Sequence, residues 1–488
     1  MNCKVEKSSI DGKIICPSNK SYTHRAIFMA SLADGKSMIK NILKSGDTIA
    51  TINACKNFGA EIKEEKNNLI VDSPNELKLQ DSIIDAANSG TTIRIAAAIS
   101  TLADTKIVLS GDQSLNKRPM QPLLKALESL GAKCSSSNGT PPISILGKIK
   151  GGEVKIPGNI SSQFISALMI VAPKLENGML LNIQGELVSK PYVDATIMAM
   201  KKFNVNVEAE IPYKKYIIHP QNYKSTTFSI PSDFSSLALL LSAAVLLGEN
   251  LSIEMTMGDM PQADEAIIDI LEKMGVVITL EKNMIKIKSP KKLDGGKFDL
   301  NDSPDLVPAV AILALKTSKP IEISNVEHVR YKETDRIAIL TRELTKLGIK
   351  VVEKKDGLIL KNSKNLVGAD LNSENDHRLF MAFCIAGMYV GNCSVSHPES
   401  VKIALGGMSG IPQRAIELEK VMLENWNNDE IVLASYNALK SEFSPFSDVR
   451  ASSEYRLRVT ANLVKKSLLI LKGLPLENLA HYSVASKL

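Results

Sequence analysis

The chain is poor in aromatic residues and in dense runs of charge. It has one tryptophan among 488 residues, and aromatic residues make up 5% of it. Its 59 basic and 53 acidic residues give a formal net charge of +6 and are spread along the sequence. Nucleic-acid-binding proteins commonly carry a basic stripe, and single-strand binders add aromatic stacking platforms. The composition therefore argues against a nucleic-acid-binding role.

Long hydrophobic runs and paired cysteines are also missing. The longest apolar stretch, LALLLSAAVLL at 237–247, is shorter than the roughly 20 residues of a membrane span and predicts a buried helix. The first residues, MNCKVEKSSIDGK, contain no apolar signal core. The six cysteines form no CxxC pair, and scattered thiols favour a reducing compartment. We therefore expect a cytoplasmic protein without membrane spans.

What the chain does contain is a repeat. Five expected helices each run into a Gly or Asn that precedes an apolar strand pattern. These turn residues are Gly59, Gly131, Asn204, Gly275 and Gly348, spaced by 72, 73, 71 and 73 residues. Gly and Asn suit the left-handed conformation that often closes a helix. The fixed interval predicts a repeated unit of mixed helices and strands, which ends after about residue 402.

Basic residues cluster at several expected helix starts, where the helix dipole disfavours cations. One example is the Lys117–Arg118 pair before Pro119, which is expected at the first helical position. The cations at such starts are Lys20, Arg25, Arg94, Lys117, Arg118, Arg330, Lys332, Arg336 and Arg378. Free amides at a helix start attract anions, and a nearby Lys or Arg strengthens this attraction. We infer a pocket lined by helix starts that binds more than one anionic group.

Each candidate residue also has a purely structural interpretation. Serines can simply cap helices, and Gly90 can be a turn residue. Asp305 could cap the apolar helix that follows it, and Glu333 with Arg336 could form an ordinary pair within a helix. The residues open to both interpretations are Gly90, Ser161, Ser162, Asp305, Glu333, Arg336 and His377.

Taken together, the motifs resemble the EPSP synthase (3-phosphoshikimate 1-carboxyvinyltransferase) family. They are SNKSYTHRA, NSGTTIR, NKRPM, SSQF, VSKPY, SPD, YKETDR and NDHR, in that order, within residues 1–402. The resemblance implies an α+β fold of two pseudo-symmetric domains built from βαβαββ-like units, an inside-out α/β barrel. It places domain I at 1–19 and 228–402, with its sixth unit incomplete, and domain II at 20–227.

The resemblance also implies the reaction. The enolpyruvyl group of phosphoenolpyruvate passes to the 5-hydroxyl of shikimate 3-phosphate, and phosphate is released, as in aromatic amino acid biosynthesis. It implies these small molecules as partners, a monomer, and no metal, organic cofactor, nucleic acid or membrane. Related transferases that act on UDP-N-acetylglucosamine carry a Cys in the loop before Arg-Pro and lack the pair Lys20–Ser21. The loop here, SGDQSLNKRPM, has no Cys, which favours the shikimate substrate.

The family's motif positions define three sets of site residues. The catalytic set is Asp305, Glu333, Lys20 and His377. The shikimate 3-phosphate set is Lys20, Ser21, Arg25, Ser161, Ser162, Gln163, Ser189, Tyr192, Asp305, His328 and Lys332. The phosphoenolpyruvate set is Lys20, Asn88, Gly90, Arg118, Gln163, Arg336, Arg378 and Lys402.

Two carboxylates carry the chemistry that the resemblance implies. Asp305 accepts the proton of the 5-hydroxyl, and Glu333 protonates the methylene carbon of phosphoenolpyruvate. Carboxylates among so many cations are expected to have lowered pKa values. His328 stands where several relatives carry Asn, and both residue types can hydrogen-bond to substrate.

The sequence after Lys402 departs from the family. ALGGMSGIPQRA and SDVRASSEYR, within residues 403–488, resemble the C-terminal domain of the FAD-binding subunit of xanthine dehydrogenase-type enzymes. Only the latter part of that domain is present and its Gly-rich FAD-binding segment is not, so we expect a fusion with a mostly helical appendage and no flavin. Two alternatives stay open: an inactive anion-binding relic with a replaced C-terminus, and a flavoprotein subunit, against which the missing segment counts.

Overall fold

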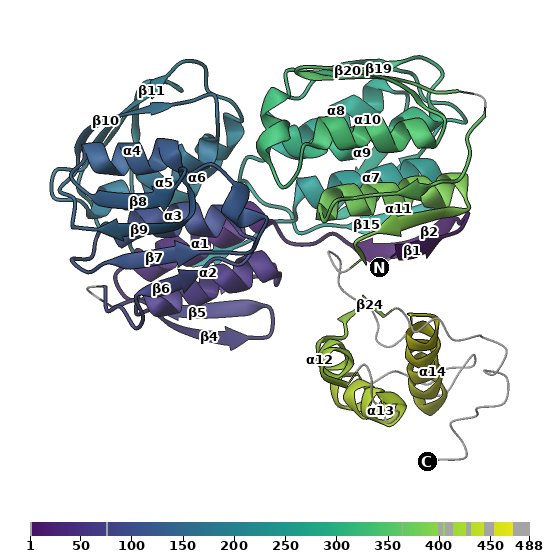
Figure 1. Cartoon of the computed structure of the whole chain (residues 1–488), viewed down its shortest axis with the longest axis horizontal. Coiled ribbons are helices and arrows are strands. Elements are labelled where there is room, and N and C mark those ends of the chain that lie inside the picture. The colour runs from purple at the N-terminus through teal and green to yellow at the C-terminus, as the bar shows by residue number, and fades with distance from the viewer. Residues whose placement is uncertain are drawn as a thin grey trace. The chain divides into compact units, whose positions relative to one another are not determined.

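The computed structural model describes residues 2–74, 77–363, 365–398, 404–405, 413–425, 431–443 and 453–471. By its internal contacts the chain separates into two compact units. One unit is Lys4–Val395, and the other is Ser396–Leu488 together with Met1–Cys3. The first unit contains two lobes, which Figure 1 colours purple to blue and teal to green.

Three four-stranded sheets form the first lobe, with strand orders β14-β3-β5-β4, β6-β7-β9-β8 and β10-β11-β13-β12. Its strands are β3 (Lys36–Lys40), β4 (Glu61–Glu65), β5 (Asn68–Asp72), β6 (Ile83–Asp85), β7 (Ile107–Ser110), β8 (Lys133–Ser137), β9 (Thr140–Leu146), β10 (Gly152–Pro157), β11 (Met179–Gln184), β12 (Glu208–Ile211), β13 (Lys215–Ile218) and β14 (Thr227–Ser229). Its helices are α1 (Lys20–Leu32), α2 (Gly46–Asn57), α3 (Gly90–Ser100), η1 (Leu115–Lys117), α4 (Gln121–Ser129), α5 (Ser162–Val171), η2 (Ala172–Lys174) and α6 (Pro191–Lys202).

The second lobe has sheets of order β16-β17-β15-β2, β18-β19-β21-β20 and β1-β23-β22. Its strands are β1 (Asn2–Val5), β2 (Ile10–Ile15), β15 (Gly248–Glu254), β16 (Val277–Glu281), β17 (Met284–Lys288), β18 (Gly296–Asp299), β19 (Ile321–Ser324), β20 (Lys350–Lys354), β21 (Gly357–Lys361), β22 (Asp370–Leu371) and β23 (Cys393–Ser396). Its helices are α7 (Phe234–Leu247), η3 (Ala263–Glu265), α8 (Ala266–Lys273), η4 (Pro304–Leu306), α9 (Val307–Ile312), η5 (Leu313–Lys316), η6 (Glu327–Tyr331), α10 (Arg336–Lys346) and α11 (His377–Val390).

The five four-stranded sheets share one pairing pattern. In each, two strands pair in parallel and an antiparallel hairpin completes the sheet, as in β10 with β11 followed by β13 and β12. The N-terminal strand β2 pairs in parallel with β15 of the second lobe, and Figure 1 shows its purple ribbon beside that lobe. The predicted repeat and α+β fold are confirmed.

The predicted turns at the helix ends are also confirmed. The helices α2, α4, α6, α8 and α10 run into them, and β4, β8, β12, β16 and β20 follow. All five turn residues have positive φ: Gly59 at 99°, Gly131 at 106°, Asn204 at 62°, Gly275 at 88° and Gly348 at 94°. Gly and Asn tolerate this left-handed backbone, so each turn carries a residue type that its backbone requires.

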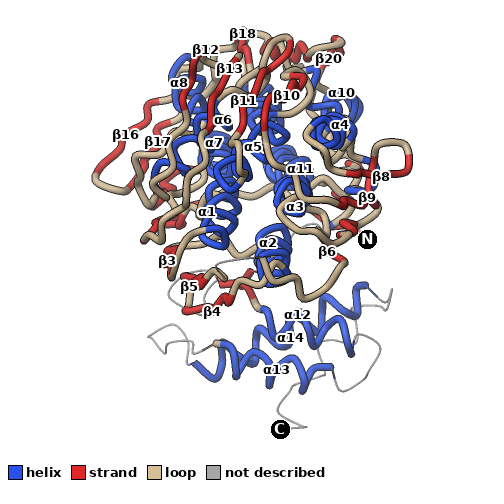
Figure 2. The backbone as a smooth tube through the Cα atoms, turned by 90° about the vertical axis from the view of Figure 1, so that its left-hand side faces the viewer, coloured by secondary structure: helices blue, strands red, loops and turns tan. Residues whose placement is uncertain are grey.

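The core of the first lobe lies between its inner helices and its sheets. Figure 2 shows α1, α3 and α5 in the middle of the lobe with strands around them. Helix α3 is buried at every position except Thr91, and its stretch Ile95–Ile99 is entirely apolar, as expected for a helix that is enclosed on all sides. The apolar stretch 237–247 lies in α7 and is almost entirely buried, as predicted. No helix in the described segments is long and apolar enough to cross a bilayer.

The second unit is mostly helical in its described part, as predicted. It contains β24 (Ala404–Leu405), β25 (Gln413–Arg414), α12 (Ile416–Asn425), α13 (Ile431–Glu442) and α14 (Ser453–Leu471). Its three helices share a small apolar core of their own, made by Ala415, Leu418, Tyr436, Leu439, Phe443, Leu457, Ala461 and Val464.

Candidate functional site

One cleft brings together residues from both lobes of the first unit. The starts of α1, α3, α5, α6, α10 and α11 border it. The predicted site residues that line it are Lys20, Ser21, Gly90, Arg118, Ser161, Ser162, Gln163, Ser189, Tyr192, Asp305, His328, Lys332, Glu333, Arg336 and Arg378. Most of the predicted site is thus assembled in one place.

The helix starts around the cleft have the predicted character. Asn19, Ser89, Ser161, Asp335 and Asp376 cap α1, α3, α5, α10 and α11 through their side chains. None of these five helices has an acidic residue in its first turn. The positive ends of α1, α3 and α5 therefore keep their attraction for anions, whereas the carboxylate caps of α10 and α11 offset part of it.

One predicted helix start is wrong. Helix α4 begins at Gln121, and Pro119 lies before it rather than at its first position. Arg118 has extended backbone, with φ −82° and ψ 139°, because the residue before a proline is driven out of the helical region. Pro122 takes the early helical place instead. Arg118 consequently lies in a loop, where its side chain reaches the cleft.

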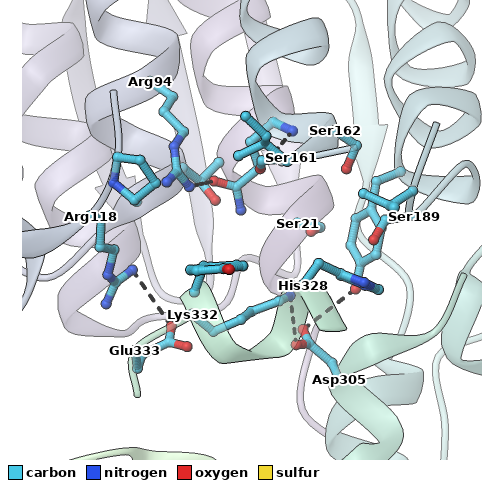
Figure 3. Close-up of a pocket in the computed structure, with 18 of the residues that line it drawn as sticks. Ser21, Arg94, Arg118, Ser161, Ser162, Ser189, Asp305, His328, Lys332 and Glu333 are labelled. Atoms are coloured by element: carbon cyan, nitrogen blue, oxygen red, sulfur yellow. Dashed lines mark hydrogen bonds and ion pairs between the residues drawn. The ribbon is translucent and has the colours of Figure 1, made fainter. Parts of the chain in front are cut away.

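Asp305 lies at the meeting point of three cations. Its Oδ1 accepts hydrogen bonds from Lys332 Nζ and Arg336 Nη1, both at 3.1 Å, and its Oδ2 accepts one from Arg378 Nη2 at 3.1 Å. Figure 3 shows Asp305 and Lys332 facing each other. The alternative that Asp305 caps the next helix is wrong, because α9 begins at Val307 without a side-chain cap.

Glu333 is held by two arginines. Arg336 Nη2 donates to its Oε2 at 2.8 Å, and Arg118 Nη1 lies 3.6 Å from its Oε1, as Figure 3 shows for Arg118. Glu333 precedes α10, which begins at Arg336, so the two do not form an ordinary pair within a helix. Arg118 comes from the other lobe, and the pair therefore spans the cleft.

The pKa values of both carboxyl groups are lowered, as predicted. Burial alone would raise the pKa of Asp305, but Arg378, Lys332 and Arg336 hold it well below its usual range. Burial likewise opposes ionisation of Glu333, and Arg336 and Arg118 hold its pKa well below its usual range. Both groups are therefore ionised at neutral pH while the cations face them.

Arg336 anchors this cluster to α11. It is 1% exposed, and its Nε donates to Asp376 Oδ2 at 2.8 Å. Asp376 is fully buried and also accepts backbone hydrogen bonds from Arg378 and Leu379 at the start of α11. The carboxylate of Asp376 thus holds Arg336 in place and also caps the start of α11, the helix that carries Arg378.

On the opposite wall, two arginines flank Gly90. Arg118 Nη2 donates to Asn88 Oδ1 at 2.6 Å, and Arg94 Nη1 donates to Gln163 Oε1. A Cβ at Gly90 would lie 3.0 Å from Arg118 Nη1 and 3.1 Å from Arg94 Nη1. The missing side chain therefore lets both guanidinium groups approach the start of α3.

Lys20 is paired across two helix starts. Its Nζ lies 3.0 Å from Oδ2 of Asp47, the second residue of α2. Burial opposes the charge of Lys20, but Asp47 outweighs it and raises the pKa of Lys20. Burial likewise opposes ionisation of Asp47, yet Lys20 lowers the pKa of Asp47 to about 2.

Three predicted site residues are described but do not line the cleft, and a fourth is not described. Arg25 is buried behind it and donates to the backbone carbonyl oxygens of Ser21 and Tyr192 at 3.1 Å each. Asn88 supports Arg118. Burial lowers the pKa of His377, the first residue of α11, to about 4. Lys402 lies outside the described residues.

Several residues of the cleft were not in the predicted sets. They are Asp47, Thr91, Arg94, Pro119, Ile160, Val188 and Tyr331. Asp47 could not be recognised as a site residue from the sequence, because the helix dipole favours an acidic residue in the first turn of any helix. Arg94 carried the signal of a cation after a helix start but was not assigned a role. Tyr331 is 60% exposed, and no feature of the sequence around it indicates a binding site.

Two family models match the chain. The model described as EPSP synthase (3-phosphoshikimate 1-carboxyvinyltransferase) matches residues 5–407. The model described as CO dehydrogenase flavoprotein C-terminal domain matches residues 377–471. The second match confirms the likeness of the tail, although it begins before the expected residue 403 and overlaps the first match.

Named relatives cover the same part of the chain. The 3-phosphoshikimate 1-carboxyvinyltransferase of Nitrosopumilus maritimus (strain SCM1) is 62% identical over 404 residues, which are 83% of this chain and 96% of that protein. The enzyme of the same name from Methanosphaera stadtmanae is 41% identical over 402 residues, with 80% and 94% covered. A solved structure of EPSP synthase from Acinetobacter baumannii matches with a TM-score of 0.69 and 25% identity, over 82% of this chain and 94% of that one.

Proposed function

The chain belongs to the EPSP synthase family, and we propose that it transfers the enolpyruvyl group of phosphoenolpyruvate to the 5-hydroxyl of shikimate 3-phosphate. One observation carries this proposal. Cations from both lobes converge on Asp305 and Glu333 in a cleft that is bordered by helix starts. The two substrates together bring two phosphates and two carboxylates, which such a cleft is suited to hold.

We assign shikimate 3-phosphate to the wall that α1, α5 and α6 form. Ser161 and Ser162 offer two hydroxyl groups at the start of α5, a suitable place for a phosphate. Ser21, Gln163, Ser189, Tyr192, His328 and Lys332 also line the cleft. Arg25 supports this wall from behind through Ser21 and Tyr192.

We assign phosphoenolpyruvate to the space between Gly90 and the arginines that face Asp305 and Glu333. Arg118, Arg336 and Arg378 would pair with its phosphate and carboxylate, and Lys20 lies between the two substrates. Gly90 gives the ligand access to the backbone of α3, and Asn88 holds Arg118 in place. The family's motif adds Lys402, and we include it in this set.

The chemistry requires one proton acceptor and one proton donor. Asp305 removes the proton as the 5-hydroxyl oxygen bonds to C2 of phosphoenolpyruvate, and Glu333 delivers a proton to C3. The C2–O bond to phosphate then breaks, and C3 returns a proton to Glu333 as the double bond re-forms. The proton held by Asp305 leaves with the released phosphate. Glu333 must be protonated for the first step. Substrate anions that draw Arg118 and Arg336 away would raise its pKa toward that state.

Cations stabilise the leaving phosphate, and preorganised charge of this kind often contributes more to catalysis than any other single effect. Arg118 and Lys20 are placed for this role, and the family's motif adds His377 to the catalytic set. The same cluster supports the division into domain I, at 1–19 and 228–402, and domain II, at 20–227, since its members come from both. We further expect a monomer in the cytoplasm.

Phosphate release tests the proposal. The full chain should release phosphate when both substrates are present and not with either one alone. Binding of shikimate 3-phosphate without phosphate release would instead favour the alternative of an inactive relic. The match of the C-terminal part to another family is the observation that motivates this alternative. If neither substrate binds, the assignment of the cleft is wrong.

A further inference from the structure

A buried carboxyl group outside the predicted site lies behind Tyr192. Asp264, in η3, is 5% exposed. Its Oδ2 lies 3.4 Å from the Tyr192 hydroxyl oxygen, within hydrogen-bond distance, and its Oδ1 has no hydrogen-bond partner among the described residues. It lines a second, smaller cavity that also reaches Tyr192 and Asp305.

The Tyr192 hydroxyl lies between two carboxyl groups. Its oxygen is 3.4 Å from Asp264 Oδ2 and 3.5 Å from Asp305 Oδ2. A phenol has one hydrogen, so it can donate to only one of these groups at a time. The other contact is favourable only if that carboxyl group itself carries a hydrogen to donate.

The two carboxyl groups have opposite surroundings. Asp305 is paired with Lys332, Arg336 and Arg378. Asp264 is in no ion pair among the described residues. Burial, followed by the charge of Asp305, raises the pKa of Asp264 to about 8. The proton at this junction therefore resides on Asp264 at neutral pH.

Other charged groups around Asp264 oppose one another. Arg378 and Lys332 lower its pKa, whereas Asp233 raises it. The titratable and charged groups that face it are Lys20 and Tyr22 of α1, Tyr192 of α6, Asp233 at the start of α7, Asp305 of η4, Lys332 before α10 and Arg378 of α11. The pKa of Tyr192 is raised well above its usual value by burial and by Asp264, so the phenol keeps its hydrogen.

We propose that Asp264 is a positioning residue for the transfer reaction: while it carries a proton, it donates to the Tyr192 oxygen and directs the Tyr192 hydroxyl to Asp305. The chain Asp264–Tyr192–Asp305 then fixes the orientation of the carboxylate that accepts the substrate proton. This inference rests on the proposed function. Loss of the proton leaves Tyr192 between two anions and removes that fixed orientation.

The pH dependence of turnover tests this role. The wild-type kcat should fall at least about fivefold as the pH rises from about 7 to about 9.5, because Asp264 ionises in this range. Asp264→Asn cannot ionise and still offers an N–H to Tyr192, so its kcat at pH 7 should stay within about threefold of wild type and lack the alkaline fall. Glu265→Gln is the matched control, an exposed acid on the same short helix, and should keep the alkaline fall.

A second variant separates positioning from substrate binding. Asp264→Ala should lower kcat about tenfold with KM for either substrate changed less than about threefold, since Asp264 does not line the cleft to which both substrates are assigned. In a Tyr192→Phe background, Asp264→Ala should leave kcat almost unchanged, because the loss of the Tyr192 hydroxyl has already broken the hydrogen-bond chain to Asp305. Should Asp264→Ala fail to fold, the isosteric Asp264→Asn carries the test.

The outcomes are distinguishable. An alkaline fall that persists in Asp264→Asn, or an Asp264→Ala enzyme with wild-type kcat and pH profile, overturns the inference. If the full chain releases no phosphate, the proposed function fails instead. Infrared difference spectra of wild type against Asp264→Asn then show whether Asp264 is protonated. A carboxylic-acid C=O band at neutral pH supports the hydrogen-bond chain Asp264–Tyr192–Asp305, and its absence refutes it.

Discussion

At the scale of single residues, the carboxylate of Asp305 offsets the positive charge of several cations in the cleft. Three cations contact it in the cleft. Replacing it removes one anionic partner from each of these cations, although Arg336 keeps Glu333 and Asp376. Buried cations with fewer anionic partners attract anionic ligands more strongly. The residue that the reaction needs as a base is therefore also the one that restrains substrate binding.

Asp305→Asn should separate these two effects. We expect kcat to fall by about 10²–10⁴, the usual contribution of a general base. Binding of shikimate 3-phosphate should be retained or tightened. Phosphate release measures the first effect and isothermal titration calorimetry the second. Turnover close to normal would show that another group takes the proton.

Gly90→Ala should act on phosphoenolpyruvate. The new Cβ would lie 3.0 and 3.1 Å from the ends of Arg118 and Arg94, tighter than ordinary contact, so both guanidinium groups must shift. We expect KM for phosphoenolpyruvate to rise roughly tenfold.

The matched control for this change is Gly46→Ala. Gly46 is also the first residue of a helix after a serine cap, and a Cβ there meets nothing within 4 Å. Its kinetics should stay at wild-type values. An unchanged KM in Gly90→Ala would mean that the two arginines accommodate the methyl group freely.

Sequence reasoning reached the site unevenly at this scale. Residues that violate a rule were found, such as Lys20 and Arg378 at helix starts. Residues that obey the rules were missed: Asp47 stands where an acid belongs, and Asp264 sits in an ordinary acidic stretch before α8. Their importance arises from contacts with residues that are distant in the sequence or across a cleft, as for Asp264 with Tyr192, and no local pattern records such contacts.

At the scale of elements, hydroxyl groups tie the first three helices together. His24 Nδ1 of α1 lies 2.6 Å from Thr51 Oγ1 of α2, which lies 2.7 Å from Thr92 Oγ1 of α3. Burial lowers the pKa of His24 to about 3. The histidine is therefore neutral in the folded protein, and its chain of hydrogen bonds depends on that state.

The free energy of unfolding should fall in acid for this reason. Between about pH 6.5 and pH 3 the unfolded chain binds a proton at His24 that the folded chain does not, so acidification through this window lowers the free energy of unfolding. Urea unfolding of His24→Gln at several pH values should show a shallower acid loss than wild type. His219→Gln, at an exposed position, is the control and should leave the slope unchanged. Equal slopes for all three proteins would contradict the buried neutral state.

The elements themselves were largely predictable. The five turns at about 72-residue spacing located five helices and the strands that follow them. The predicted start of α4 was wrong. Pro119 suits the first position of a helix, but it also drives Arg118, the residue before it, into extended backbone, and α4 begins only at Gln121. Strand pairing was not predictable from periodicity, since β2 and β15 are far apart in the sequence.

At the scale of the whole molecule, the second unit raises the question of what it contributes. Leu439 is fully buried in its core, and Leu439→Asp would place a charge among apolar groups and disrupt that unit. Every described residue of the proposed site lies in residues 20–378. We expect kcat for phosphate release to change less than about twofold in this variant, because no described residue of the proposed site belongs to this unit.

Flavin binding completes this test. Titration of the full chain with FAD, followed by flavin fluorescence, should show no saturable binding, because the Gly-rich FAD-binding segment is not in the sequence. Saturable binding that is lost in Leu439→Asp would favour the flavoprotein alternative. A large loss of kcat in the same variant would instead make the second unit a working part of the transferase.

The pairing of β2 with β15 has a consequence for synthesis on the ribosome. Residues 10–15 emerge first, yet their partner at 248–254 follows only after roughly 10–50 s at bacterial to eukaryotic elongation rates. The first lobe, whose strands run from Lys36 to Ser229, can close during that wait while the leading strand stays unmatched. Among the described residues, the last strand of the second lobe, β23, ends at Ser396. The residues that follow it therefore leave the ribosome only after every described strand of both lobes.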